Sequence, residues 1–237
     1  MNELLFVVAP YVAIVLAIVM SVVRARKFPF TVSALSSQLL ESKRLRWGSV
    51  PFHWGISLIL VGHLFALIVP RGVELWNGAP LRLYLLEATG IALGLWTLFG
   101  LVVLIVRRIR SPRVRSVTTP MDGVVLGVIL VQVVTGVWIA MGYRWGSFWG
   151  TSVFVPYIRS LFAFQPRPEL VEALPVVLKL HVLSFWAFLA IFPFSRLVHI
   201  VTLPLGYLTR PFQKVVRHRP TPGVYHPASD QVLDRIP

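Results

Sequence analysis

Residues 52–69 read FHWGISLILVGHLFALIV, an apolar run of helical length that carries two histidines, His53 and His63. A bilayer core needs about 20 apolar residues as a helix, so this run is typical of a membrane-spanning segment. An imidazole inside hydrocarbon is costly unless something binds it, and ionisable side chains within a span are therefore candidates for function. The run predicts both a membrane helix and a site.

A second long apolar run, residues 176–203, also carries two histidines, His181 and His199. Three further runs have the length of a span, and they cover about 4–23, 83–106 and 123–141. The hydrophobic fraction of 56% and the mean hydropathy of +0.75 exceed those of ordinary water-soluble domains. The sequence therefore predicts an all-α membrane protein with five transmembrane helices.

Basic residues flank these runs unevenly. The segments 24–49 and 107–121 and the C-terminal tail are rich in Lys and Arg, whereas 70–82 and 142–175 are much less basic. By the positive-inside rule, we expect the N-terminus outside and the C-terminus in the cytoplasm. This topology and contact with anionic lipid explain the net charge of +14, so we expect no nucleic acid partner.

The chain is expected to form one transmembrane domain, residues 1–205, and a cytoplasmic tail, 206–237, that contacts partner subunits. The tail is polar and rich in proline, which favours an extended conformation. Aromatic residues in the outer segment 142–175 favour a short helix at the membrane interface. Because there is no cysteine, an iron–sulfur cluster held by cysteines must belong to another subunit. The first apolar run follows Glu3 and precedes the basic residues, which indicates an uncleaved helix rather than a secretory signal.

The two histidine-bearing runs are expected to be antiparallel, which matches their histidines in depth. His53 then lies with His199 on the inner side, and His63 lies with His181 on the outer side. If the last helix is continuous, the interval from His181 to His199 makes about five turns and places both rings on one face. Pro193 lies within that interval and is expected to bend the helix. The arrangement predicts two metal centres at different depths.

Two axial imidazoles are typical of haem iron that transfers electrons, because both axial positions are then filled. Zinc fits less well, since it needs four ligands at one point and the histidines divide by depth. A proton relay is an alternative, although no run of intramembrane carboxylates accompanies the histidines. For each histidine taken singly, a hydrogen-bonded interior residue is the ordinary alternative.

The motifs around these histidines resemble the gamma subunit of membrane-bound respiratory nitrate reductase, a di-haem cytochrome b. The resemblance covers about residues 5–215. Its motifs are SSQLL at 36–40, FHxGI at 52–56, VGH at 61–63, RR at 107–108, SPRVR at 111–115, LH at 180–181, FPFSRLVHI at 192–200 and YLTR at 207–210.

The resemblance implies two b haems between the second and fifth spans. It implies that His63 and His181 hold the outer haem and that His53 and His199 hold the inner one. Quinol would be oxidised near the outer haem, and its protons would be released outside. Electrons would pass to an iron–sulfur beta subunit, and a molybdenum alpha subunit would reduce nitrate in the cytoplasm. The chain is therefore expected in the cytoplasmic membrane.

The resemblance also suggests where quinol binds. The family has a lysine near the quinol at the outer end of the third span, and Arg82 is the best-aligned residue here. Arginine donates hydrogen bonds but does not readily lose its proton, and an ordinary interfacial arginine is the alternative. Gly62 is expected to let the quinol ring approach the haem beside His63, with helix packing as the alternative. Glu87, near the same end of the third span, is either a proton acceptor or a paired surface acid.

Three arginines at the inner membrane edge are candidate partners for haem propionates, because guanidinium groups bind carboxylates well. They are Arg108, Arg113 and Arg196. The alternative for each of them is a charge that only sets the membrane topology.

Other functions remain open from the sequence. One is a quinone-linked cytochrome b of another oxidoreductase, including a nitrite-oxidising one or one that reduces quinone. A membrane anchor without haem would explain the spans but not the histidines. A metal or proton transporter is the third alternative.

Overall fold

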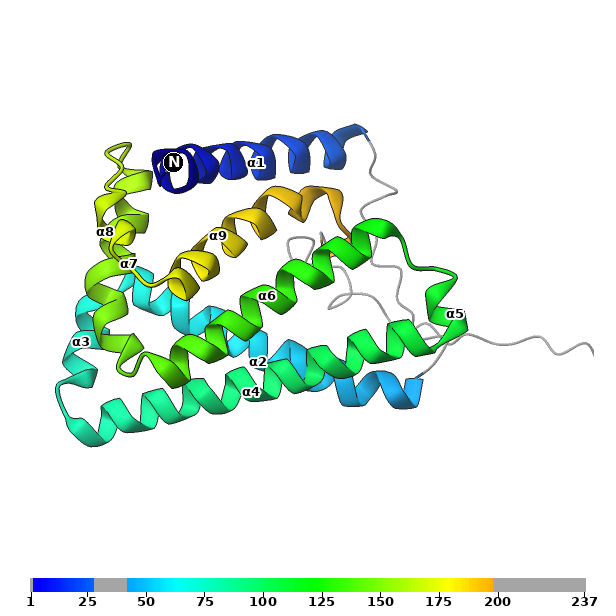
Figure 1. Cartoon of the computed structure of the whole chain (residues 1–237), viewed down its shortest axis with the longest axis horizontal. Coiled ribbons are helices and arrows are strands. Elements are labelled where there is room, and N and C mark those ends of the chain that lie inside the picture. The colour runs from blue at the N-terminus through cyan, green and yellow to red at the C-terminus, as the bar shows by residue number, and fades with distance from the viewer. Residues whose placement is uncertain (1, 28–41, 198–237) are drawn as a thin grey trace, which may run out of the picture. The chain divides into compact units, whose positions relative to one another are not determined.

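The computed structural model describes residues 2–27 and 42–197. The chain divides into two compact units, Met1–Thr202 and Leu203–Pro237, and every described residue belongs to the first. The predicted tail 206–237 and the ligand candidate His199 therefore lie outside the described residues. Within the described part, the secondary structure is helical and contains no strand (Figure 1).

The five predicted spans are confirmed as five helices with the length and hydropathy to cross a membrane. The chain is therefore a multi-pass membrane protein. The first span joins a short π-helical stretch, η1, to α1. The spans are η1 (Leu4–Val8) with α1 (Ala9–Lys27), α2 (Ser42–Ile68), α4 (Pro80–Arg110), α6 (Pro120–Gly142) and α9 (Val176–Ile191) with the 3-10 turn η4 (Phe192–Phe194).

Helix α9 is shorter than predicted, because it ends at Ile191 and is followed by the 3-10 turn η4. Pro193 lies in this turn; it has no backbone N–H and its ring clashes with the preceding helical turn. A continuous helix over 176–203 is thus wrong, and so is the premise that placed His181 and His199 on one face. Arg24 holds the turn, since its guanidinium donates to Pro193 O at 2.7 Å and to Ser195 O at 2.6 Å.

Among the described residues, three shorter helices lie between spans, besides the single turn α5 (Pro112–Arg115) that follows α4. The helix expected within 142–175 is present as α7 (Gly146–Phe162), and α8 (Glu169–Glu172) follows it. A further helix, α3 (Pro70–Asn77), occupies a segment for which the sequence predicted none. The segments that join α2 to α4 and α6 to α9 therefore contain helices.

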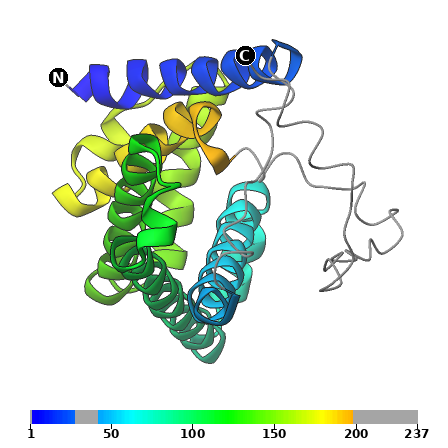
Figure 2. The same ribbon diagram turned by 90° about the vertical axis from the view of Figure 1, so that its right-hand side faces the viewer.

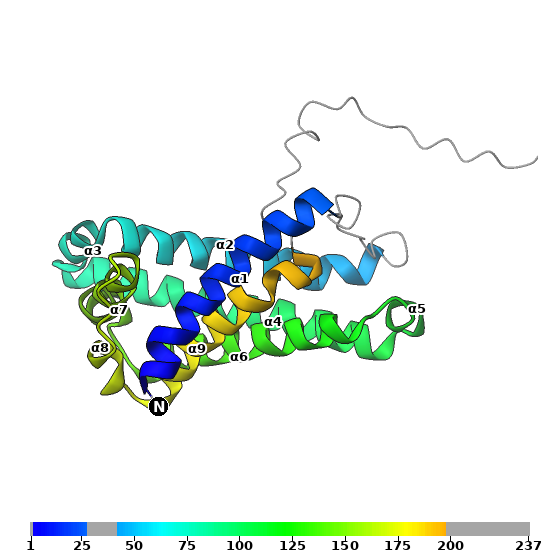
Figure 3. The same cartoon turned by 90° about the horizontal axis from the view of Figure 1, so that it is seen from above.

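The spans contact one another in a chain of neighbours. Helix α2 packs against α4, α4 against α6, α6 against α9, and α9 against α1 (Figures 1 and 2). The view from above shows α1 running alongside α9 (Figure 3). Helices α2 and α9, which carry the histidines, are not a packed pair within the described part of the chain. Within the described part, α4 and α6 connect the two helices.

Small residues bring α2 and α4 close together. A Cβ atom built on Gly100 would lie 2.5 Å from Phe52 N and 2.7 Å from Gly48 O, distances that no real side chain could occupy. Helices in membranes associate through such close backbone approaches, because lipid supplies little hydrophobic drive between them. This contact fixes the position of α2, whose residue after Phe52 is His53.

Candidate functional site

Both histidines of α2 have Nδ1 close to the backbone carbonyl four residues earlier, and His53 Nδ1 also lies 3.1 Å from Ser49 Oγ. His53 Nδ1 lies 2.8 Å from Ser49 O, and His63 Nδ1 lies 2.8 Å from Ile59 O, in each case the carbonyl four residues earlier. A carbonyl oxygen only accepts, so Nδ1 carries the hydrogen and Nε2 of the neutral ring keeps its lone pair. Both side chains are exposed. The two rings therefore present a free metal-binding nitrogen on the surface of α2.

His181 on α9 is held by a different helix. Its Nδ1 lies 3.0 Å from Thr135 Oγ1 on α6. The Thr135 hydroxyl donates to backbone carbonyls of its own helix, with Val131 O at 2.6 Å and Gln132 O at 3.1 Å, so Oγ1 accepts from the His181 ring. The other ring nitrogen, Nε2, lies 3.1 Å from the amide nitrogen of Gln132, and Ser184 donates to the Gln132 carbonyl oxygen. All three described histidines thus share the tautomer with hydrogen on Nδ1.

His63 lies on α2 and His181 lies on α9. Since α2 and α9 do not pack directly on each other, the two rings belong to separate walls of the bundle. No group of three or more His, Asp or Glu side chains that could hold a metal ion occurs among the described residues. A haem needs only two axial protein ligands. Nε2 of His53 and of His63 fits that need, and Nε2 of His181 fits it once the Gln132 amide turns away.

The two quinol-site candidates lie in different surroundings. No described atom lies within 4 Å of a Cβ atom built on Gly62, so packing between described helices does not account for this glycine. Arg82 is exposed, and its guanidinium lies over the Trp76 ring, 5.4 Å from the centroid, and donates to Leu75 O at 3.3 Å. These contacts tie the start of α4 to the end of α3.

Helix α7 connects α4 to the C-terminal end of α2. The Glu87 carboxylate accepts from the backbone N–H of Ser147 at 3.0 Å and from its hydroxyl at 2.6 Å, at the first turn of α7. A carboxylate is stabilising at a helix N-terminus. Glu87 was expected to be either a proton acceptor or a paired surface acid, and its hydrogen bonds to Ser147 match the paired acid. At the other end, Arg159 donates to Leu67 O at 2.7 Å and to Ile68 O at 3.2 Å. Arg159 therefore caps α2 about one turn beyond His63.

Two of the propionate candidates share a carboxylate within the chain. Arg108 lies 3.0 Å from Asp122, and Arg196 lies 3.6 Å from the other oxygen of the same group. Asp122 also forms a capping box with Thr119 at the start of α6. The cluster joins α4, α6 and the segment after η4. The side chain of Arg113 lies outside the described residues.

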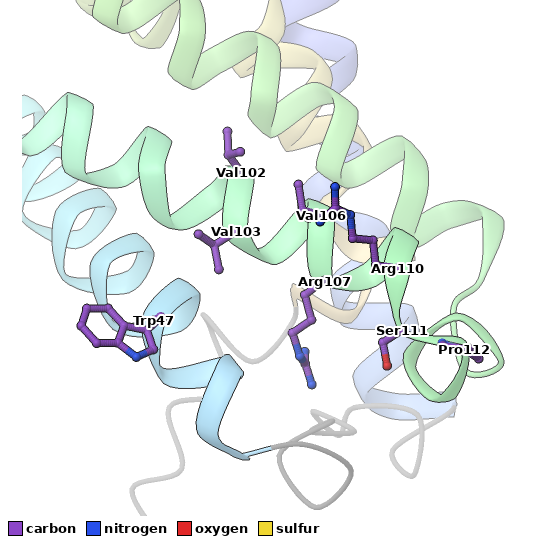
Figure 4. A pocket seen from close by; sticks show the side chains of 8 residues that line it. All are labelled: Trp47, Val102, Val103, Val106, Arg107, Arg110, Ser111 and Pro112. Carbon is purple, nitrogen blue, oxygen red and sulfur yellow. The ribbon is translucent and has the colours of Figure 1, made fainter.

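A cavity of about 480 Å³ opens at the Arg110 end of α4 (Figure 4). Trp47 of α2 lines it together with residues from α4 and the turn that follows, among them Arg107 and Arg110. Its described lining includes no histidine.

The residues around His181 were missed by the sequence reasoning. Gln132 gave a usable signal, because a lone amide within the apolar run 123–141 is costly in a membrane unless bonded. Thr135 and Gly136 gave none, since threonine and glycine are common in membrane helices. Arg159 resembled any interfacial arginine, and only the tertiary structure shows that it caps α2.

The fold and the site define a membrane protein in which histidines from two separated transmembrane helices present metal-binding nitrogens. Comparison with known families gives the finer class. The model of the nitrate reductase gamma subunit family matches residues 2–219, and the chain belongs to this family. It is accordingly a membrane subunit of a nitrate reductase complex, an oxidoreductase, and gamma chains imply alpha and beta partner subunits.

Individual relatives agree over most of the chain. It is 32% identical over 214 residues to the nitrate reductase gamma chain of Bacillus subtilis, covering 89% of this chain and 96% of the relative. It is 31% identical over 223 residues to the respiratory nitrate reductase 1 gamma chain of Escherichia coli, covering 92% and 99%. A more distant match, 28% identical over 177 residues, is a component of the dihydromethanophenazine:CoB–CoM heterodisulfide reductase of Methanosarcina mazei, covering 72% and 62%.

Proposed function

We propose that this chain is the di-haem cytochrome b subunit of a respiratory nitrate reductase. In this proposal it oxidises quinol near the outer face and delivers electrons to an iron–sulfur beta subunit, which serves a molybdenum alpha subunit. The observation that carries the proposal is the shared state of His53, His63 and His181. Each ring donates through Nδ1, which leaves Nε2 with a lone pair within an apolar span.

The ligand sets follow from depth and from the family resemblance. His63 and His181 would hold the outer haem, as the family resemblance implies. His53 would hold the inner haem with His199, which remains a sequence-based assignment. When bound through two imidazoles, haem iron exchanges one electron at a time and leaves no open position for substrate.

The chain's own residues would orient these groups. The i−4 carbonyls of Ser49 and Ile59 fix the ring planes on α2, and such outer contacts normally fix the tautomer of a ligand histidine. Gly62 leaves open space next to His63 for a flat ring to approach. Arg82 would donate to a quinone oxygen only after leaving Leu75 O or by using another of its N–H groups.

The proposed direction of transfer separates charge across the membrane. Electrons would move inward while quinol protons leave outward, and each separated charge corresponds to about 2.3 kcal/mol per 100 mV. This requires the N-terminus outside and the tail in the cytoplasm, as the positive-inside rule predicts. It also requires the beta subunit to dock on the cytoplasmic side.

One observation favours a second candidate. The heterodisulfide reductase relative carries a different redox partner in its name, which shows that similar chains occur in other oxidoreductases. A quinone-linked cytochrome b of another enzyme, including one that runs towards quinone reduction, would use the same histidines. The longer coverage of the gamma chains favours nitrate reductase.

A spectroscopic and biochemical test separates these functions. The chain is purified with its natural partners from membranes, and haem, nitrate reduction and co-purifying subunits are measured together. We expect two low-spin b-type haems per chain and nitrate-dependent reoxidation after reduction by quinol. Haem without nitrate-dependent reoxidation would favour the second candidate. A chain without haem would contradict both.

A further inference from the structure

The outer histidine pair is asymmetric in how its two rings are oriented. His63 donates to a carbonyl of its own helix, whereas His181 donates to the Thr135 hydroxyl of a neighbouring helix. The first contact lies within α2, so His63 and the carbonyl that accepts from it move together. The second depends on the packing of α6 against α9 and on one particular side chain.

The Thr135 side chain is held in place beside His181 by burial and by a hydrogen bond within α6. The residue is buried, with 6% of its surface exposed, and its hydroxyl donates to Val131 O within α6. With its hydrogen committed there, Oγ1 can only accept from His181. The next residue, Gly136, borders the same ring, because a Cβ atom built on it would lie 3.1 Å from Cε1 of His181. Thr135 therefore sets the tautomer and Gly136 leaves room for the ring.

Gln132 occupies the opposite nitrogen of the ring. Its amide nitrogen lies 3.1 Å from Nε2 of His181, and Ser184 donates to its amide oxygen. Nε2 has one lone pair, so a donor at this atom and an iron at this atom exclude each other. Iron binding through Nε2 thus requires the Gln132 amide to turn away. It leaves the contact between Thr135 and Nδ1 unchanged.

We propose that Thr135 is a positioning residue for the outer haem, which holds His181 in the Nδ1–H tautomer and increases electron donation from its ring to iron. This inference rests on the proposed di-haem function. Hydrogen bonding from the second nitrogen of a ligand histidine fixes its orientation and raises its basicity. A more basic axial ligand favours ferric iron, so the Thr135 contact lowers the midpoint potential of the outer haem.

The test uses three variants in the intact membrane complex. Thr135→Val removes the acceptor at nearly constant shape, and Thr135→Ser retains it. Thr89→Val is the matched control, because the Thr89 hydroxyl also donates to a carbonyl four residues earlier, at 2.7 Å, on another span. Each complex is titrated by reduced-minus-oxidised absorption and by electron paramagnetic resonance of the low-spin haems.

We expect Thr135→Val to raise the midpoint potential of one haem and to change its low-spin resonance, while the second haem is unaffected. Thr135→Ser and Thr89→Val should behave as wild type. Loss of one haem in Thr135→Val, with both haems retained in Thr135→Ser, would equally support the assignment.

Three results would overturn the inference: an unshifted potential in Thr135→Val, an equal shift in Thr135→Ser, or a change shared by both haems. These results would leave the proposed function standing, since the wild-type complex would still contain two haems. A wild-type complex without haem would instead contradict the function itself.

Discussion

Gly136 on α6 and His181 on α9 lie so close that a Cβ atom at residue 136 would be 3.1 Å from Cε1 of the imidazole. That distance is tighter than ordinary van der Waals contact, so a larger residue must displace the ring or separate the helices. This carbon, Cε1, is bonded to both ring nitrogens of His181, so a displacement here moves both of them. A larger side chain on α6 would therefore displace His181 on α9, a proposed haem ligand.

Gly136→Val should displace the His181 ring and lower the occupancy of the outer haem by at least half, as measured by haem content per purified complex. Gly127→Val is a control on the same helix, because no described atom lies within 4 Å of a Cβ atom at residue 127. Normal haem content in Gly136→Val would show that the ring does not need this space.

Arg159→Gln should loosen the C-terminal end of α2, because it removes the charged donor to Leu67 O and Ile68 O. We expect a loss of about 1 kcal/mol of stability, seen as a lower thermal midpoint of the purified complex. Arg167→Gln is a suitable control, since Arg167, like Arg159, is an exposed arginine, but it lies on the segment after α7. Equal midpoints for the two variants would argue against a capping role.

Asp122 and Arg108 should be energetically coupled, because their side chains lie 3.0 Å apart and are partly shielded. In a double-mutant cycle of Asp122→Asn and Arg108→Gln, we expect a coupling of about 0.5 to 1 kcal/mol in thermal stability. If Arg108 instead binds a haem propionate, Arg108→Gln should shift the inner haem potential and the cycle should be additive.

Tyr157 should contribute a pH-dependent part of the stability of the outer region. Burial raises the pKa of its hydroxyl to about 12, and the hydroxyl donates to Phe6 O at 2.8 Å. The folded state holds this proton more tightly than the unfolded state, so its contribution is complete below pH 10 and is lost towards pH 12. Tyr157→Phe should lower stability by about 1 kcal/mol at neutral pH and flatten the alkaline loss, as thermal unfolding at a series of pH values will show.

The sequence predicts most of the fold because membrane spans are encoded by local hydropathy, which does not depend on tertiary contacts. The run 52–69 is one example, although α2 begins earlier, at Ser42, since its basic first turns are helical as well. The end of the last helix was predicted wrongly. Pro193 was identified as a bend, yet the structure shows that the α-helix stops at Ile191.

The candidate site is less accessible from sequence because orienting contacts join residues distant in the chain. The apolar surroundings of His63 and His181 single them out, whereas Thr135 is separated from His181 by 46 positions and has no local signature. Arg108 and Arg196 were expected as propionate partners, and only the structure shows that they also bind Asp122. The quinol and propionate assignments remain predictions.

The most direct measurement is the number of haems bound by the wild-type complex and by His63→Ala, counted from pyridine haemochrome and reduced-minus-oxidised spectra. The account predicts two low-spin b haems in the wild type and one in the variant, with quinol oxidation lost. Two haems in His63→Ala, or none in the wild type, would contradict it.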